Sequence, residues 1–294
     1  MRRSLLILAV ALGTAHFARA DEGMWTYDNF PAAKLEKKYG FAATQAWLES
    51  ARRSSLRLAG GCSGSFVSAN GLVMTNHHCV RGCVGQISSK ARDYAEGGFA
   101  AQSLEQEVKC PEIELNELLQ MTDVTRRMKE GTKGLAAGSP EYGKKQKELK
   151  TAIEKECAAG DEKARCDVVS LYRGGIYSLY KYRRYQDVRL VFVPEQAAAN
   201  FGGDPDNFNF PRFALDMSFV RAWDDGKPVK PEHFFKWSEQ GAKEGELVFV
   251  SGHPGSTRRT LTVAEYEDLK DYSTPERLIE LAQWRGQPLF GRTP

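Results

Sequence analysis

The chain has 294 residues, of which 41% are hydrophobic and 27% are charged, and its formal net charge is +3. Residues 1–20 contain three Arg and no acidic residue, so the rest of the chain holds 38 basic and 38 acidic residues. This balance gives no support to a nucleic-acid or membrane-surface partner, and the length is sufficient to bury a full core.

The first twenty residues have the pattern of a cleaved secretory signal. Arg2 and Arg3 form a basic start, an apolar run follows over Leu5–Leu12, and a small-residue cleavage site ends at Ala20. The apolar run is too short to span a bilayer. We therefore expect cleavage after Ala20 and an exported protein that is periplasmic, at the cell surface or secreted. An uncleaved amphipathic N-terminus is the weaker alternative.

Residues 24–58 are predicted to form a helical lead-in, because apolar residues recur at helical spacing from Trp47 to Leu58. Gly60 and Gly61 end this pattern. The lead-in carries no specific functional motif.

A β-hairpin is expected next, with strands over 65–68 and 72–75. Asn70-Gly71 joins them and is the strongest short-range signal for a hairpin turn. The second strand runs directly into residues 76–79, Asn-His-His-Cys, and would present a histidine at its end.

The chain contains an even number of cysteines, all beyond the signal segment, which favours disulfides in an oxidising compartment. One pair would join the outer ends of the hairpin, a second would close a short loop, and a third follows by elimination. In that order the pairs are Cys62–Cys79, Cys157–Cys166 and Cys83–Cys110.

A zinc site is the alternative use of these cysteines. It would combine His77 or His78 with Cys79 and Cys83, and it lacks an evident fourth ligand. We therefore expect neither a metal nor another cofactor.

Residues 84–115 are predicted to mix short strands and loops, and residues 118–180 to form a helical excursion that Gly138-Ser139-Pro140 divides into two helices. The charged residues of the excursion indicate a solvated face. Tyr172–Tyr185 combines aromatic and basic residues, as a nucleic-acid surface can, but its spacing favours a helix that packs Tyr and Leu against a core.

Strands return after this excursion. They are predicted over 187–193, over 216–223 before an Asp225-Gly226 turn, and over 247–250, with a dense turn region over 200–212. A helical pattern begins at 264 and continues to 281.

A serine-type acyl transfer needs a nucleophile, a histidine that takes its proton and an aspartate that orients the histidine. His78 and Asp216 occur in the order that chymotrypsin-like folds use. Neighbouring side chains on a strand point to opposite faces, so only one of His77 and His78 can reach the site and the other would be a packed neighbour. His253 is interpreted as a turn residue.

Three motifs resemble the bacterial dipeptidyl-peptidase 7/11 family of exported serine exopeptidases: GLVMTNHHC, GGDPDNFNFPRFALDMSFVR and VSGHPGST. The resemblance extends in order over residues 21–294. It implies a chymotrypsin-like double β-barrel with an α-helical domain inserted between the barrels, and release of dipeptides from the free N-terminus of peptides. It also implies that His78 is the general base and Asp216 the orienting carboxylate.

The same resemblance implies that Asn207 and Phe208 hold the terminal amine of the substrate. Phe208 replaces the Trp usual in the family, and Phe210 replaces a second Trp. Phenylalanine retains an aromatic face for a cation–π contact but loses the indole N–H.

The expected fold class is mainly β with α-helical insertions, here the first barrel and the start of the helical domain. Residues 1–20 would be the signal peptide, and 21–260 the N-terminal part of the peptidase domain with the helical excursion at about 118–180. Residues 261–294 would begin a truncated α-helical domain.

Ser63 and Ser65 lie in a segment that resembles a nucleophile loop, but they precede the histidine and are interpreted as turn residues. The resemblance places the catalytic serine beyond residue 294, so this chain alone would be inactive. The alternatives are a truncated module that binds peptide N-termini or a partner, and a trypsin-like endopeptidase. We expect peptide substrates with a free N-terminus and no nucleic-acid or membrane partner. A homodimer is one allowed assembly. The sequence does not determine which residue is preferred at the cleavage position.

Overall fold

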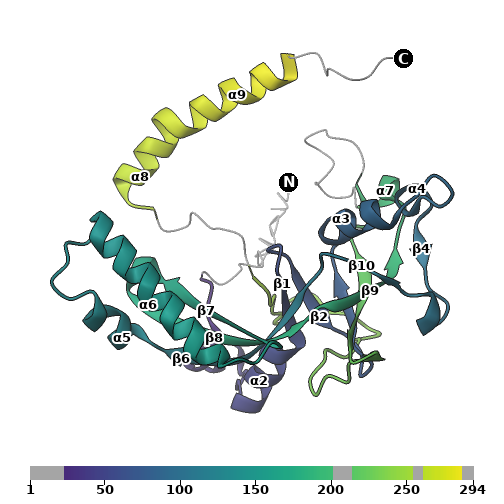
Figure 1. Cartoon of the computed structure of the whole chain (residues 1–294), viewed down its shortest axis with the longest axis horizontal. Coiled ribbons are helices and arrows are strands. Elements are labelled where there is room, and N and C mark those ends of the chain that lie inside the picture. The colour runs from purple at the N-terminus through teal and green to yellow at the C-terminus, as the bar shows by residue number, and fades with distance from the viewer. Residues whose placement is uncertain (1–22, 201–213, 254–260, 287–294) are drawn as a thin grey trace, which may run out of the picture. The chain divides into compact units, whose positions relative to one another are not determined.

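The structure, a computed structural model, describes residues 23–200, 214–253 and 261–286 (Figure 1). The chain divides into two compact units, Met1–His253 and Pro254–Pro294. Across the described ranges, no helix is both long enough and apolar enough to cross a membrane. The signal segment and the predicted amine-binding residues Asn207 and Phe208 lie outside the described residues.

The first unit is mainly an antiparallel sheet with helices packed against it. Its strands are β1 Ser55–Leu58, β2 Ser63–Phe66, β3 Leu72–Thr75, β4 Phe99–Ala100, β5 Val108–Lys109, β6 Leu115–Asp123, β7 Ala164–Leu171, β8 Ile176–Tyr185, β9 Asp187–Val193, β10 Ser218–Asp224 and β11 Lys227–Pro228. Its helices are η1 Tyr27–Asn29, α1 Ala32–Tyr39, α2 Gln45–Ser54, α3 His77–Ile87, α4 Tyr94–Gly97, η2 Leu104–Gln106, α5 Thr125–Gly131, α6 Pro140–Ala158, η3 Tyr172–Gly174 and α7 Gln196–Ala199.

The strand pairs of this sheet form a circuit together with the chain segments that connect β5 to β6 and β8 to β9. β1 pairs with β2, then β3, β10 and β9 follow as successive neighbours. β5 pairs with β9, and β6 pairs with β8, so the chain from β5 to β6 runs beside the chain from β8 to β9. β6 also pairs with β1. The largest core cluster draws on strands all round this circuit, and Leu56, Phe66, Val73, Val188 and Val220 in it have no exposed surface.

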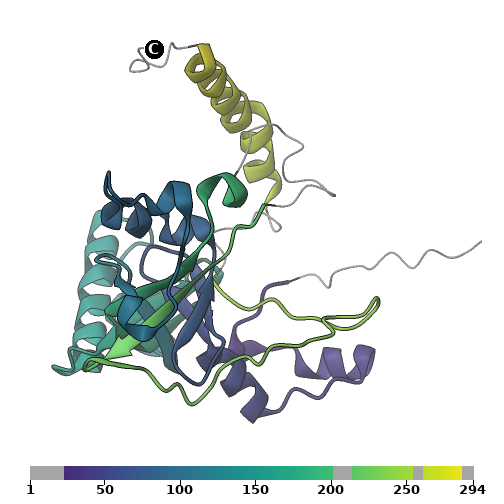
Figure 2. The same cartoon turned by 90° about the vertical axis from the view of Figure 1, so that its right-hand side faces the viewer.

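A second part of the sheet extends from this circuit. β6 and β8 continue outward, β7 pairs with β8, and α5 and α6 pack against them, as both views show (Figures 1 and 2). Met128, Ile153, Val168 and Tyr177 form a separate small core between these helices and strands.

The predicted hairpin is confirmed, with its first strand two residues earlier than expected. Ser65 pairs with Met74, and Phe66 pairs with Val73. Gly71 lies in the turn with a φ of +69°, and a Cβ at this position would come within 2.8 Å of the Val229 carbonyl oxygen. Only glycine therefore fits this turn without strain.

Residues 172–185 do not form the predicted helix. Apart from the short η3 turn, this segment is strand β8, in which alternate residues Ser178, Tyr180 and Tyr182 are buried. Tyrosine has a high β propensity, and β6 and β7 supply pairing partners on both sides. The prediction that tyrosines pack against a core is correct. The predicted helical spacing of the buried residues is wrong, because they alternate as in a strand.

Two further predictions need correction. The expected lead-in helix stops at Ser54, because Leu56 and Leu58 lie on β1 between β2 and β6. The excursion over 118–180 contains α5 and α6 as expected, but strands β6, β7 and part of β8 accompany them.

Residues 247–250 do not form the predicted strand. No described strand pairs with them, and the Val250 side chain is almost fully exposed. Phe249 is held instead by aromatic contacts with Phe30, Phe41 and Trp47 at ring-centroid distances of 5.0–6.0 Å. An isolated β-prone segment has no ladder hydrogen bonds to stabilise it.

The second unit is a nearly continuous helix, as the pattern over 264–281 predicts. Its parts are α8 Val263–Asp268, the π-helical turn η5 Leu269–Ser273 and α9 Thr274–Gly286. A capping box between Thr262 and Glu265 begins the helix.

Candidate active site

The histidine pair lies at the start of α3, not at the end of a strand as expected. β3 ends at Thr75, and Asn76 occupies the N-cap position with an extended backbone. His77 and His78 are therefore the first and second residues of the helix. The strand-based argument for their opposite orientations does not apply, but successive residues on a helix also point in different directions.

His78 contacts Asp216 through two hydrogen bonds. Its Nδ1 lies 2.7 Å from one carboxylate oxygen, Oδ2, and its backbone N–H donates to the other, Oδ1, at 3.0 Å. Asp216 lies two residues before the start of β10, whose Ser218 pairs with Thr75 at the end of β3. The antiparallel pairing of β3 and β10 thus brings the two residues together across 138 positions of sequence.

The environment of Asp216 favours its ionised form. Burial on its own raises the pKa of the Asp216 carboxyl, but the backbone and side-chain hydrogen bonds from His78 outweigh it, so that the pKa lies below its usual value. The carboxylate also lies at the N-terminus of α3, where the helix dipole stabilises negative charge.

His77 has a different environment from His78. It is 1% exposed, and its Nε2 has no hydrogen-bond partner within the described part of the chain. Burial lowers the pKa of His77, which keeps the ring neutral. The structure therefore brings His78, and not His77, into hydrogen-bond contact with Asp216.

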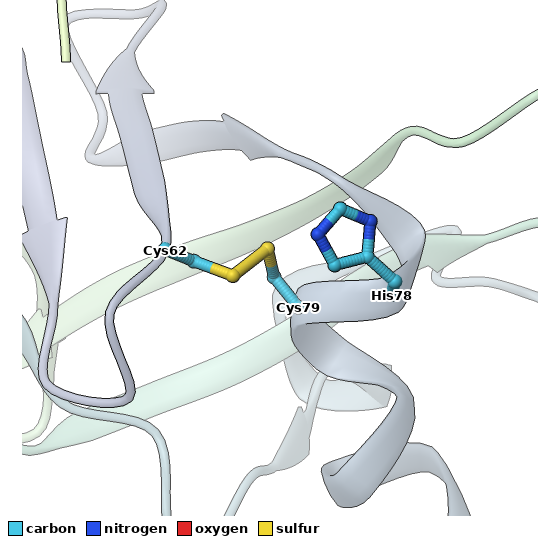
Figure 3. Close-up of side chains that lie close together, drawn as sticks. All are labelled: Cys62, His78 and Cys79. Carbon is cyan, nitrogen blue, oxygen red and sulfur yellow. A yellow bond between two sulfur atoms is a disulfide. The ribbon is translucent and has the colours of Figure 1, made fainter. Parts of the chain in front are cut away.

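A disulfide joins Cys62, just before β2, to Cys79 in the first turn of α3 (Figure 3). The His78 ring lies beside it, and the ligand atoms of Cys62, His78 and Cys79 are all within 4.8 Å of one another. Both sulfurs are bonded to each other, however, and zinc binding requires thiolates. This cluster therefore has one available ligand, which is insufficient for a metal site.

The other cysteines also form disulfides, and the three pairs are those favoured from the sequence. Cys83–Cys110 links α3 to the segment between β5 and β6, and Cys157–Cys166 links α6 to β7. Two of the three disulfides thus fix α3, the helix that carries His78.

Asn76 contacts Asp216, and the sequence analysis assigned it no role. Its amide Nδ2 lies 3.0 Å from the Asp216 backbone oxygen and 3.3 Å from Oδ2. The contact joins residues 140 positions apart, so no local signal in the sequence indicates it.

Ser63, the first residue of β2, contacts His253. The His253 backbone N–H donates to Ser63 Oγ at 2.7 Å, whereas Ser65 lies within the β2–β3 pairing. Burial, with the positive charge of Arg57, lowers the pKa of His253 to about 4. In the described part of the chain neither serine is hydrogen-bonded to His78, which agrees with their interpretation as turn residues.

Comparisons with known proteins identify the family. The Peptidase S46 pattern matches residues 20–288. Dipeptidyl-peptidase 7 of Porphyromonas gingivalis is 33% identical over 286 residues, covering 91% of this chain and 40% of the relative. An Asp/Glu-specific dipeptidyl-peptidase of Shewanella putrefaciens is 34% identical, covering 92% of this chain and 39% of that relative. The chain thus spans about 40% of the length of these relatives.

Solved structures of related proteins have a similar fold. The crystal structure of Porphyromonas endodontalis DPP11 in an alternate conformation has a TM-score of 0.77 at 26% identity, covering 93% of this chain and 44% of that one. The same protein in complex with the dipeptide Arg-Glu has a TM-score of 0.65 at 27% identity, covering 76% of this chain and 36% of that one. The resemblance found in the three sequence motifs is confirmed, and the protein belongs to the Peptidase S46 family.

Proposed function

We propose that this chain is the N-terminal part of an exported serine dipeptidyl-peptidase, in which His78 is the general base and Asp216 orients it. The observation that carries the proposal is the pair of hydrogen bonds from His78 to the Asp216 carboxylate. With Nδ1–H donating to Asp216, the other ring nitrogen, Nε2, is the acceptor for a serine proton.

The charge of Asp216 supports the role of its partner. Its lowered pKa keeps the carboxylate ionised at neutral pH. An ionised carboxylate holds the imidazole in the required tautomer and stabilises the imidazolium that forms when the serine attacks the peptide carbonyl. The His78 side chain is 59% exposed, so its free edge is accessible to a nucleophile supplied by another part of the protein.

We place the nucleophilic serine and its oxyanion hole in the portion of the relatives' length that this chain does not span. In this proposal the strand circuit is the first of two chymotrypsin-like barrels. Residues 1–20 are the signal peptide, 21–260 belong to the peptidase domain, and 261–294 begin the inserted helical domain. The helical character of 263–286 supports the last assignment.

Selection for the second peptide bond requires recognition of the substrate amine. We assign this role to Asn207 and Phe208, through an amide acceptor and an aromatic face. The names of the relatives, dipeptidyl-peptidase 7 and Asp/Glu-specific dipeptidyl-peptidase, support a peptide substrate with a free N-terminus.

The test compares one peptide in its free and N-acetylated forms, incubated with the native protein that contains this sequence. We expect dipeptides from the free peptide and no cleavage of the acetylated one. Internal cleavage of both forms would indicate an endopeptidase. If neither form of the peptide is cleaved and the mass of the native product matches residues 21–294, the protein would be a truncated module that binds peptide N-termini or a partner.

A further inference from the structure

The N-cap of α3 is satisfied in an unusual way. Asparagine is a preferred N-cap residue because its side-chain oxygen accepts a hydrogen bond from the second or third N–H of the helix. Asn76 occupies the N-cap position of α3, yet its side chain makes no such bond. The second N–H of the helix, that of His78, donates to Asp216 Oδ1 instead.

The Asn76 side chain is directed to the same carboxylate. Its Nδ2 contacts the Asp216 backbone oxygen and Oδ2. A backbone carbonyl oxygen and an ionised carboxylate oxygen can only accept hydrogen bonds. The amide nitrogen of Asn76, not its amide oxygen, is therefore assigned to face them. Asn76 thus bridges the backbone and the side chain of Asp216.

Asp216 has its two oxygens held from different directions. Oδ1 accepts from the His78 backbone, while Oδ2 receives Asn76 Nδ2 and the His78 ring nitrogen Nδ1. The backbone oxygen of Asp216 is also held by Asn76. Rotation of the carboxylate would break at least one of these bonds, so its plane is fixed relative to the His78 ring.

We propose that Asn76 is a positioning residue that fixes the Asp216 carboxylate against His78, a role that rests on the proposed peptidase function. The Asn76 amide donates to Asp216, and Asp216 in place of Asn76 accepts the N–H at the start of α3. Asn76 touches no reacting atom and acts only through this carboxylate.

The substitutions Asn76→Ser and Asn76→Asp separate positioning from capping. Serine and aspartate are N-cap residues of about the same quality as asparagine, so a residue that only capped α3 would tolerate both. Serine is too short to bridge both Asp216 oxygens, and aspartate places a second carboxylate against Asp216. The matched control is Asn29→Ser, which removes an asparagine hydrogen bond of 3.1 Å to the Tyr172 hydroxyl.

The first readout is nuclear magnetic resonance of the full chain. The ¹⁵N shifts of the His78 ring show which nitrogen carries the proton, and the ¹³C shift of the Asp216 carboxyl follows its titration. We expect the Nδ1–H form in the wild type and in Asn29→Ser. In Asn76→Ser we expect mixed tautomers and a higher pKa of Asp216, because a hydrogen bond to its ionised form is lost. Asn76→Asp should produce a larger change. His77, which also acts electrostatically on Asp216, stays in every variant.

The second readout is dipeptide release by the complete enzyme. We expect kcat to fall about tenfold or more in Asn76→Ser, with KM unchanged, because the lost bond acts on the base and not on substrate binding. Wild-type ring and carboxyl signals in both folded variants would overturn the positioning role, as would loss of the folded circular dichroism spectrum in both. A different outcome is that the Asn76 variants show altered signals while the wild-type protein releases no dipeptides. This would overturn the peptidase function and leave the positioning role of Asn76 intact.

Discussion

Asp216 holds both the ring and the backbone of His78, at 2.7 Å from Nδ1 and 3.0 Å from the amide nitrogen. The same carboxylate therefore orients the imidazole and caps the helix that carries it. Both bonds end on one carboxylate, so Asp216 determines the tautomer of the His78 ring and, together with the two disulfides of α3, helps to fix the position of His78.

The first prediction concerns the charge of Asp216. Asp216→Asn should lower kcat of the complete enzyme by about 10⁴-fold, as in the Ser-His-Asp template, because the amide stabilises the wrong tautomer of His78. Dipeptide release under saturating substrate measures the effect. Asp225→Asn, at the exposed turn after β10, should leave the rate unchanged. Equal rates for the two variants would remove Asp216 from the mechanism.

The second prediction concerns stability at acidic pH. Burial lowers the pKa of His253 to about 4, below the value of about 6.5 in an unfolded chain. Protonation thus favours the unfolded state, and this contribution is complete above pH 6.5 and decreases as the pH falls toward 4. Urea unfolding across this range should show a smaller loss of stability in His253→Phe than in the wild type. His77, whose pKa burial also lowers, contributes equally to both proteins, so parallel curves would count against the buried neutral His253.

The third prediction concerns the attachment of β10. Glu107 is 2% exposed in its side chain and accepts hydrogen bonds from Arg221 Nε at 2.7 Å and Trp223 Nε1 at 2.8 Å. Glu107→Ala should lower the free energy of unfolding by about 3 kcal/mol, because Arg221 would be left without its buried partner.

The control for this prediction lies two residues earlier in the chain. Glu105 is exposed, so Glu105→Ala should change the free energy of unfolding by less than about 0.5 kcal/mol. Similar losses in both variants, measured by urea denaturation, would show that the Glu107 ion pair has no special contribution.

The fourth prediction compares the Cys62–Cys79 disulfide, which lies beside His78, with the Cys157–Cys166 disulfide between α6 and β7. Replacing Cys62 and Cys79 by serine opens a loop with a sequence separation of 17 and should cost about 3 kcal/mol of stability. Replacing Cys157 and Cys166, with a separation of 9, should cost about 2.5 kcal/mol. Dipeptide release at a temperature where both variants are folded should fall only in the first, whose disulfide lies beside His78. A parallel fall in both would mean that neither disulfide has a local role.

Elements with strong local signals could be predicted from the sequence. Asn70-Gly71 determines the turn of the β2–β3 hairpin, and the alternating pattern over 187–193 matches β9 at both ends. The helix after 263 follows from its own apolar spacing and capping residues. In each case the local preference and the tertiary environment agree.

Elements that depend on distant partners could not be predicted in this way. Tyr180 and Tyr182 fit a strand only because β6 and β7 lie on either side, and residues 247–250 lack such neighbours. The start of α3 was mistaken for a strand end, although Asn76 is a typical N-cap residue. The sequence order of His78 and Asp216 suggested their contact, whereas the Asn76 contact arises from the β3–β10 pairing.

The most direct test of the account is dipeptide release by the complete enzyme carrying His78→Ala, compared with His233→Ala. His233 lies beside Glu232 and has no contact with Asp216, so its variant controls for loss of an imidazole. We predict wild-type release in His233→Ala and a rate at least about 10⁴-fold lower in His78→Ala, since the serine would lose its base. A folded His78→Ala enzyme that releases dipeptides at the wild-type rate would contradict the assignment.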